Sequence, residues 1–408
     1  MVISASKVQS APRSRWSPEY QLMLACARCV PTGALIHQVL DSVGDRLNWE
    51  ELIQSASMHG VLPLVYRSLT EIAPDRVPKA VLSRFMKLYL LSASHSHRLA
   101  NATLDLVNIF ANHDIPMMVF KGPVLAEMVY GSINFRRFAD VDLLIHEGDV
   151  ARVRQLLIDL DFHPRLLAKD QETSDYLRSR IWDDSFTHAQ KQVTLDLHWQ
   201  LMPDYFPVDF DLEQLWSNRQ PVLLQETELQ SFCPEDLLLY LCAHGSKELW
   251  RRLIWVCDIA EFVRVYPHLP WRSLLERARA LGMERMFLLG MTLAHDLLDM
   301  PIPDPLVSET QHEVIQSLAK SFQERMSCDL ETTVESAEHG FWLFHNPLHL
   351  RLRDHWRDRL PQYWLTFQFL ITPNEEDRAF LPLPKGLHPL YFLVRPVRIG
   401  LKLLTKRR

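Results

Sequence analysis

Acidic side chains occur at alternating positions in two short segments of this sequence. Asp140 and Asp142 are separated by a single residue, and the same spacing separates Asp196 from His198 in the run Val193–Trp199. Successive side chains of a β-strand point to opposite faces, so residues two apart share a face. If both segments are strands, each presents its polar groups on one face and aliphatic residues on the other.

Three carboxylates meet in one place if these strands are neighbours and their polar faces coincide. Like charges at short range are costly unless cations neutralise them. Mg²⁺ prefers carboxylate oxygens and keeps coordination positions for phosphate and water. Two such ions, roughly 3.5–4 Å apart, can activate a hydroxyl, orient an α-phosphate and stabilise a leaving pyrophosphate. We therefore interpret Asp140, Asp142 and Asp196 as ligands of two Mg²⁺ ions in a site for nucleotidyl transfer.

A second group of residues favours phosphate binding. Lys121-Gly122 lies between a predicted strand and a predicted helix, where backbone amides and the helix dipole attract anions. Lys121 adds a positive charge there, and Arg136 or Arg137 adds another from the loop that precedes Asp140. Taken singly, an Asp-x-Asp pair is more often a solvated turn, and a Lys-Gly pair a surface turn. The order of the Lys-Gly turn, the Asp-x-Asp pair and the third acid along the chain favours their belonging to a single site.

The surrounding sequence predicts a small mixed β-sheet with helices, an α+β core. Short apolar runs between turn residues indicate strands, and apolar residues at a 3.6-residue period indicate helices. Gly122 is expected to cap the first helix, because proline follows it. The predicted elements are, in order, a strand at Pro116–Phe120, a helix at Val124–Tyr130, a strand at Ala139–Ile145, a helix at Asp149–Leu160, and a hairpin of Ser185–Gln190 and Val193–Trp199.

Mainly helical regions flank this core on both sides, so that the core is inserted between them. Leucine, alanine and other apolar residues recur there at helical spacing. The predicted organisation is a disordered arm (1–15), a helical N-terminal domain (16–114), the sheet-containing core (115–205), a helical domain (206–300) and a helical C-terminal region with a basic tail (301–408).

Composition excludes several classes of protein. The chain has 408 residues with 44 Lys or Arg against 50 Asp or Glu, a net charge of −6, and this acidity argues against broad nucleic-acid binding. No apolar run reaches the roughly 20 residues of a membrane-spanning helix, and the N-terminal residues contain no apolar stretch typical of a secretory signal. We expect a cytoplasmic protein with free thiols. Cys26-Ala-Arg-Cys29 is interpreted as two small buried side chains rather than a metal or redox site.

Several of these segments together resemble one known family. Phe120-Lys-Gly122, Asp140-Val-Asp-Leu-Leu-Ile145 and Leu195-Asp-Leu-His-Trp199 are similar to the pattern of an uncharacterised bacterial nucleotidyltransferase family of the polymerase-β-like superfamily. The match continues in His244-Gly-Ser-Lys247 and Asp258-Ile259, and covers most of the chain from about Trp49 onward.

The resemblance implies a Mg²⁺-dependent enzyme that transfers NMP from an NTP, with ATP as the expected donor, and releases pyrophosphate. It implies that Asp140 and Asp142 bind the metals and that Asp196 is the third carboxylate, which helps to activate the incoming hydroxyl. Lys121, Gly122 and Arg137 are then expected to contact phosphate. The acceptor is an unidentified small molecule or protein.

The sequence departs from the superfamily at one point. Lys121-Gly122 occupies the turn where Gly-Ser is usual. A non-catalytic nucleotide-binding or scaffold protein that retains the fold is therefore the alternative, and a metal-dependent phosphohydrolase with the same acids is a third interpretation.

Polar residues outside the acidic strands allow two interpretations each. His198 shares a face with Asp196, and either binds metal or substrate or makes a structural hydrogen bond near the acids. A helical segment after the core contains four further polar residues, which either close the ligand pocket or, as we favour, form buried pairs between helices. These four are His244, Lys247, Arg252 and Asp258. A buried Asp258 would require an arginine or histidine partner.

The segment Lys385–Arg408 carries seven Lys or Arg and no acid, interleaved with apolar residues. A basic amphipathic helix of this kind can lie on an anionic membrane or dock to an acidic partner. The simpler interpretation, which we favour, is a final helix that packs on the protein and ends in a frayed Lys406-Arg-Arg408.

Overall fold

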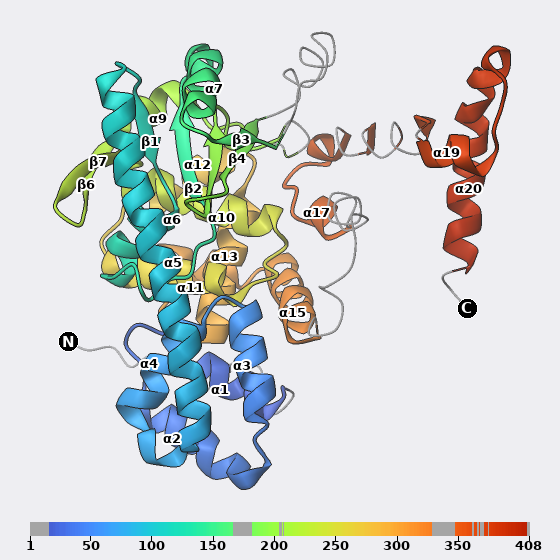
Figure 1. Cartoon of the computed structure of the whole chain (residues 1–408). Coiled ribbons are helices and arrows are strands. Elements are labelled where there is room, and N and C mark those ends of the chain that lie inside the picture. The colour runs from blue at the N-terminus through green and yellow to red at the C-terminus, as the bar shows by residue number, and fades with distance from the viewer. Residues whose placement is uncertain are drawn as a thin grey trace.

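The protein has an α+β fold in which a five-stranded mixed sheet lies in the middle of a mainly helical chain (Figure 1). The predicted fold class is therefore confirmed. The structure, a computed structural model, describes residues 16–165, 182–203, 206, 208–328, 347–360, 363–364, 367, 371–373 and 375–405. The predicted arm, residues 1–15, lies outside the described residues.

Helices make up most of the described chain before the sheet, from Pro18 to Asn112. Four short helices pack together, and the last helix, α5, is much longer than the others. Their bounds are α1 (Pro18–Cys26), α2 (Gly33–Val43), α3 (Trp49–Met58), α4 (Leu62–Ile72) and α5 (Lys79–Asn112). Cys26 and Cys29 are buried free thiols, and burial raises the pKa of both, that of Cys29 to about 12. The interpretation of this pair as small buried side chains is confirmed.

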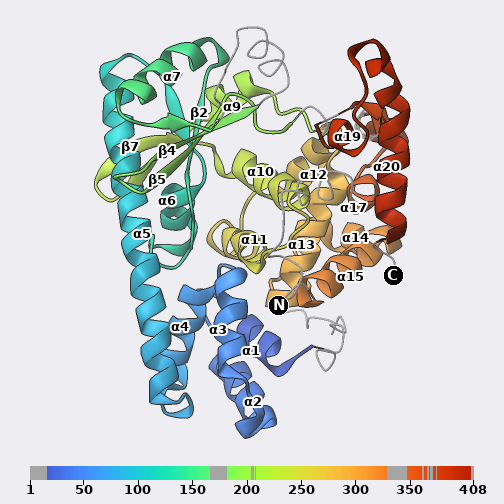
Figure 2. The same cartoon turned by 45° about the vertical axis from the view of Figure 1, so that its right-hand side comes forward.

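The long helix α5 joins the N-terminal helices to the sheet. Its 34 residues span about 50 Å at 1.5 Å per residue. The first half packs on α4, and the second half places Leu99, Leu106 and Phe110 in the apolar core behind the sheet. Figures 1 and 2 both show α5 running past both parts of the molecule.

The central sheet has the strand order β1-β2-β5-β4-β3. β2 pairs with β5 in parallel, and the other neighbouring strands are antiparallel. The predicted strands and the hairpin are confirmed. The elements are β1 (Met117–Val119), α6 (Gly122–Leu125) continued by a π-helical turn η4 (Ala126–Tyr130), β2 (Val141–Ile145), α7 (Val150–Asp159), β3 (His163–Pro164), β4 (Asp183–His188) and β5 (Val193–His198).

The two faces of the sheet differ in chemistry, as the alternation predicts. Val141, Leu143, Leu195 and Leu197 are fully buried in one apolar cluster with Phe186. Helices α5 and α7 contribute further side chains to that cluster. The opposite face carries the acids and lies toward the helices that follow the sheet.

One element contradicts the prediction of a helical region over residues 206–300. A two-stranded antiparallel hairpin, β6 (Gln220–Leu224) and β7 (Thr227–Ser231), follows the short helix α9 (Leu212–Asn218) and packs beside β1. Its turn residue Gln225 has a φ of +56°. The run Thr227–Ser231 contains one apolar residue, Leu229, so it carries no clear alternation of apolar and polar residues that would indicate a strand.

Helices form the remainder of the described chain. Figure 2 shows α10, α11 and α13 between the sheet and the C-terminal helices. No helix in the described part of the chain is long and apolar enough to cross a bilayer. The bounds are α10 (Pro234–Lys247), α11 (Leu253–Val265), α12 (Trp271–Ala280), α13 (Glu284–Leu298), α14 (Val307–Thr310), α15 (Glu313–Cys328), α17 (Pro347–Arg351), α19 (Glu375–Phe380) and α20 (Tyr391–Thr405).

Candidate metal and nucleotide site

The strand register places two of the predicted carboxylates side by side. Asp142 on β2 is the direct partner of Asp196 on the parallel strand β5. His198 is two residues further along β5 and shares the face of Asp196. The ligand atoms of Asp142, Asp196 and His198 all lie within 4.8 Å of one another. The expectation that the two acidic strands are neighbours with coinciding polar faces is confirmed.

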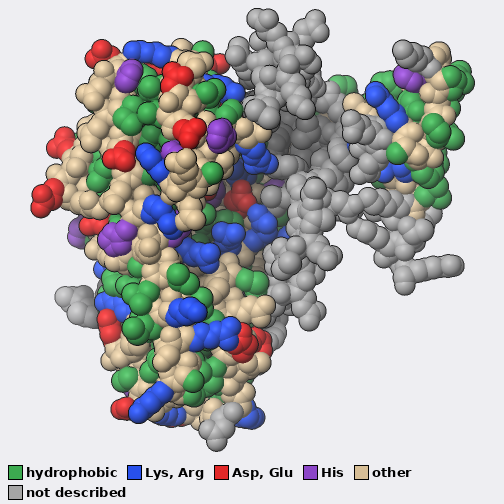
Figure 3. All heavy atoms as spheres, in the orientation of Figure 1, with side chains coloured by type: hydrophobic (Ala, Val, Ile, Leu, Met, Phe, Trp, Pro, Cys, Tyr) green, Lys and Arg blue, Asp and Glu red, His purple; other side chains and the backbone are tan. Residues whose placement is uncertain are grey.

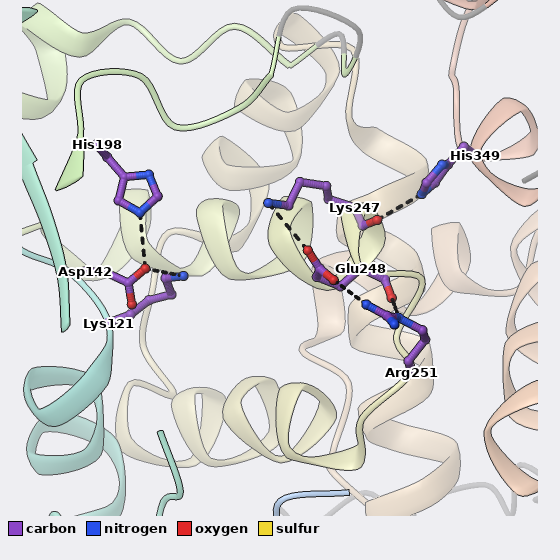
Figure 4. Close-up of polar contacts among 7 residues, drawn as sticks. All are labelled: Lys121, Asp142, His198, Lys247, Glu248, Arg251 and His349. Atoms are coloured by element: carbon purple, nitrogen blue, oxygen red, sulfur yellow. Dashed lines mark hydrogen bonds and ion pairs between the residues drawn. The ribbon is translucent and has the colours of Figure 1, made fainter. Parts of the chain in front are cut away.

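Asp142 is the most buried carboxylate of this group, with 2% of its surface exposed. Its Oδ1 atom lies 2.6 Å from the Lys121 ammonium and 3.3 Å from His198 Nε2 (Figure 4). Burial by itself would raise the pKa of Asp142, but Lys121 and His198 outweigh burial and hold this pKa well below its usual range. Asp142 is therefore ionised at neutral pH and is neutralised by a neighbouring cation.

Lys121 reaches Asp142 from the end of β1. Burial would lower the pKa of Lys121, whereas the charge of Asp142 raises it, and the net pKa is well above the ordinary value. The ammonium lies 5.8 Å from the ring centroid of Tyr240 on α10, and that helix covers the acidic face here. The ammonium already supplies positive charge to Asp142, so a metal ion held by this carboxylate would compete with Lys121 for it.

Gly122 allows the chain to pass close to the loop before β2. Its φ is +57°, in the region that glycine adopts readily. A Cβ atom at this position would lie 3.2 Å from the carbonyl oxygen of Asp140. The turn therefore packs directly against the residue that precedes β2, and this packing sets the distance between Lys121 and the acids.

Substituting Gly122 is expected to weaken metal binding more than substituting Gly131, a second glycine at positive φ. Gly122→Ala should lower the free energy of unfolding by about 1–2 kcal/mol, the cost of a side chain at positive φ, and should also weaken Mn²⁺ binding because the Asp140 carbonyl must move. Gly131→Ala is the matched control, since Gly131 has a φ of +67° and no atom within 4 Å of its Cβ position. Urea unfolding and Mn²⁺ titration measure both effects. Equal Mn²⁺ affinities in the two variants would contradict the argument.

Asp140 lies just before β2 and is half-buried. It is outside the group whose ligand atoms lie within 4.8 Å of one another. Burial and the charge of Asp142 raise the pKa of Asp140 to about 6, although Lys121 acts in the opposite direction. The Asp140 carboxyl group is therefore close enough to feel the charges of Asp142 and Asp196, although it lies at the edge of the group that these acids form with His198.

Asp196 is half-buried and is held by a neighbour on β4. Ser185 is its direct partner in the antiparallel register, and Ser185 Oγ donates a hydrogen bond of 2.7 Å to Asp196 Oδ1. This bond occupies one oxygen and orients the carboxylate toward Asp142.

Asp183 is a further acid that the sequence analysis did not identify. It is the direct partner of His198 in the register of β4 and β5, so it shares the acidic face. Burial raises the pKa of Asp183, with Asp196 acting in the same direction and His198 and Lys247 acting against it. The signal was present in the sequence, because Asp183 and Ser185 are two residues apart and extend the polar alternation of the hairpin.

His198 has one ring nitrogen engaged and one without a described partner. Nε2 faces Asp142, whereas Nδ1 is buried with no hydrogen-bond partner in the described residues. The ring lies edge-on to Phe120, with centroids 5.4 Å apart. The donors on this face are mainly carboxylate oxygens with one imidazole, a set that suits a divalent cation.

Positive side chains on the helical side face the acids. Figure 4 shows Lys247 projecting from the end of α10 toward the group formed by Asp142, His198 and Lys121. Glu248 holds this lysine at 3.5 Å and accepts a 2.7 Å hydrogen bond from Arg251. On the surface shown in Figure 3, Lys and Arg side chains gather around an acidic side chain in the middle of the molecule.

The two candidate arginines of the loop before Asp140 have different surroundings. Arg136 is buried and donates from Nε and Nη2 to the carboxylate of Asp258 on α11, at 2.7 and 2.9 Å. Tyr130 donates a third hydrogen bond of 2.7 Å to Asp258. The prediction that a buried Asp258 requires an arginine or histidine is confirmed. Arg136 is used in this buried pair, so its interpretation as a phosphate ligand is wrong.

Arg137 lies at the surface and converges with Arg252 on the end of α3. Arg137 donates to the carbonyl oxygen of Ser57 at 3.1 Å. Leu253, the residue after Arg252, donates its backbone N–H to His59 Nδ1 at 3.2 Å. Burial lowers the pKa of Arg252, and the charges of Arg251 and Arg137 lower it further. Neither Arg137 nor Arg252 forms an ion pair with an acid within the described residues, so positive charge accumulates here beside Asp140.

His244 packs among aromatic rings on α10. It stacks on Tyr240 with centroids 5.8 Å apart and lies edge-on to Trp255 at 5.6 Å. Burial, together with the charges of Lys121 and Lys247, holds the pKa of His244 well below its usual value. The ring is therefore neutral at physiological pH.

Comparison with known proteins gives a match over more than half of the chain. A model of a family described as uncharacterised nucleotidyltransferases matches residues 45–299, a range that contains the acidic group and the facing helices α10 and α11. No curated protein matches the chain.

Proposed function

Because the chain belongs to this uncharacterised nucleotidyltransferase family, we propose that it is a Mg²⁺-dependent enzyme of the polymerase-β type. It transfers NMP from an NTP, with ATP as the expected donor, to a nucleophile on an unidentified acceptor, and pyrophosphate leaves. The observation that carries the proposal is the pairing of Asp142 with Asp196 on one sheet face beside His198, in a match to this family.

Each acid has a distinct proposed role. Asp140 and Asp142 hold the divalent ions, Asp196 completes the site and helps to remove the proton of the acceptor hydroxyl, and His198 orients Asp142. Bound Mg²⁺ supplies the positive charge that offsets charge development on the phosphates. Asp196 suits its role because Ser185 fixes one carboxylate oxygen and leaves the other for the ion or the hydroxyl.

Positive side chains on both sides of the acids are proposed to bind the phosphates. Lys121 and the Gly122 turn lie on the sheet side, and Arg137 and Arg252 lie together beside Asp140. An arginine without an acidic partner can form bidentate hydrogen bonds with phosphate. Asp142 would hold the metal in competition with Lys121, and a Lys121 side chain free of Asp142 would contact a phosphate oxygen.

If Lys121 competes with a metal for Asp142 and also contacts phosphate, replacing it should have opposite effects on metal binding and on nucleotide binding. Lys121→Met should tighten Mn²⁺ binding about tenfold, because unit charges about 4 Å apart interact by ~1–4 kcal/mol, and should raise the KM for ATP. Electron paramagnetic resonance of Mn²⁺ and steady-state kinetics measure the two effects. Lys121→Arg is the control that keeps the charge. Weaker Mn²⁺ binding by Lys121→Met would show that the lysine supports the site rather than competing for it.

The direct test is release of pyrophosphate, or transfer of label from α-labelled ATP, across candidate acceptors with Mg²⁺. The double variant Asp140→Asn with Asp142→Asn should lack this activity, and activity that survives in it would overturn the proposal. Release of inorganic phosphate instead would favour a phosphohydrolase.

The non-catalytic alternative has one observation in its favour, since Lys121 already neutralises Asp142. Calorimetry with ATP in the presence and absence of Mg²⁺ separates the two functions. An enzyme of the proposed type requires the metal for tight ATP binding, whereas a scaffold need show no such dependence.

A further inference from the structure

Helices α19 and α20 contact each other through buried charged groups. Asp377 on α19 is fully buried and accepts hydrogen bonds from two arginines of α20, Arg395 Nη1 at 3.0 Å and Arg398 Nε at 2.6 Å. Tyr391 is buried beside them, and its hydroxyl accepts a 2.9 Å hydrogen bond from the backbone of Leu383. The contact between the two helices is therefore polar.

The outward side of α20 is apolar. Leu393 and Val397 are four residues apart on α20, and Leu390 lies three residues before Leu393, directly before the helix. These residues form one stripe, with Phe392 beside it. Leu393 is 68% exposed and Val397 60%. Figure 3 shows hydrophobic side chains along the outer side of this segment, which stands apart from the body of the molecule in Figure 1. An amphipathic helix of a globular protein normally turns its apolar stripe inward, and here the arrangement is reversed.

Exposed apolar side chains are concentrated in this part of the chain. Thirteen of the twenty-one large apolar side chains that are strongly exposed in the described residues lie between Trp356 and Leu401, and the long segment before Trp356 contributes only eight. They include Trp356 and Trp364, and exposed aromatic rings of this kind settle at the boundary between lipid and water. A contiguous apolar surface on one element marks an interaction site.

The charge of the same segment indicates what covers this surface. From Lys385 to Arg408 the sequence has seven Lys or Arg and no acid, although the whole chain has a net charge of −6. Two of the seven, Arg395 and Arg398, share the single negative charge of Asp377. Lys402 and three further basic residues follow the apolar stripe in the sequence. The segment thus combines a buried polar interior, an apolar outer stripe and excess positive charge.

We propose that α20 lies in the surface of a bilayer that contains anionic lipid, with Leu393 and Val397 below the headgroups. An apolar stripe next to basic residues is the pattern by which helices bind in the plane of such a surface. A lipid surface accounts for apolar contact and positive charge together. The interpretation of the final helix as one packed on the protein applies only to the inner side of α20, where Tyr391 and Arg395 are buried. This proposal is independent of the enzymatic one.

Co-sedimentation of the full chain with vesicles tests the proposal. Vesicles of phosphatidylcholine with phosphatidylglycerol should bind the chain at least about tenfold more tightly than phosphatidylcholine alone, because basic residues near an anionic surface are attracted to it. Leu393→Asp with Val397→Asp should weaken binding more than about tenfold, since both substitutions replace an aliphatic side chain that favours burial by a charged one that opposes it. The matched control is Leu90→Asp with Leu91→Asp on α5, which are 52% and 60% exposed and should leave binding unchanged.

Several outcomes would overturn the proposal. Equal binding by the Leu393/Val397 variant and the native chain would show that the stripe does not meet lipid, and equal binding to neutral and anionic vesicles would remove the role of charge. Light scattering of the same proteins tests the alternative that a second copy of the chain packs on the stripe. A dimer that the Leu393/Val397 variant abolishes, without lipid binding by either protein, would assign the stripe to a second copy of the chain. The Mn²⁺ affinity of the α20 and α5 variants should equal that of the native chain. A failure of the lipid-binding proposal can therefore be told apart from a failure of the enzymatic proposal.

Discussion

Nucleotidyl transfer is expected to fall by about 10³ or more in Asp142→Asn, and by a similar factor in Asp196→Asn. Each change removes one negative charge from the paired positions on β2 and β5 and leaves the side-chain size almost unchanged. A catalytic metal supplies several kcal/mol of transition-state stabilisation, and each ~1.4 kcal/mol corresponds to a factor of ten in rate. The measurement is label transfer from α-labelled ATP, with Mn²⁺ affinity determined in parallel.

Asp105→Asn is the control for this loss. Asp105 is an exposed acid on α5, outside the acidic face, and the chemical change is identical. Its rate and Mn²⁺ affinity should equal those of the native chain. If Asp142→Asn and Asp196→Asn also keep native Mn²⁺ affinity while circular dichroism shows them folded, these two acids do not hold the metal.

The second large effect concerns stability. Asp258→Ala should lower the free energy of unfolding by about 3–5 kcal/mol, because it leaves the buried guanidinium of Arg136 without its counter-charge. The hydroxyl of Tyr130 loses its acceptor in the same variant. Urea unfolding followed by circular dichroism measures the change. Because Arg136 lies in the loop before Asp140, the variant should also loosen the acidic site and weaken Mn²⁺ binding.

Two comparisons isolate the cause of this loss. The double variant Arg136→Met with Asp258→Leu removes both charges and should recover a large part of the stability, since apolar residues often replace a buried ion pair without loss. Glu50→Ala breaks the exposed ion pair with Arg84 and should cost less than about 1 kcal/mol. An equally large loss in Glu50→Ala would show that burial is not the reason.

Many local elements around the site followed from the sequence because they depend on neighbouring residues. The hairpin from Asp183 to His198 has its turn where Lys191-Gln192 predicts it, and Gln192 adopts a φ of +51°. The apolar residues of β2 and β5 are buried on the face opposite the acids. The hairpin β6–β7 was missed because its strands are short and its outer positions carry polar residues amid helical sequence.

The pairing of charges could not be predicted in the same way. Arg136 and Asp258 are 122 residues apart in the chain, and the sequence indicated only that a buried Asp258 requires some partner. Lys121 was expected to face phosphate, but in the structure it contacts Asp142. The apolar stripe of α20 was visible in the sequence, yet its outward direction follows from the buried pair of Asp377 with Arg395.

The sequence by itself determined which side chains share a strand face, since covalent geometry makes successive side chains of a strand alternate. Asp196 and His198 are together for that reason alone. Only the tertiary structure decided that β2 lies parallel to β5 with Asp142 opposite Asp196, and which cation neutralises each buried acid. Coulomb energies and burial depend on distances through space between elements far apart in the chain, and no local pattern of residues specifies those distances.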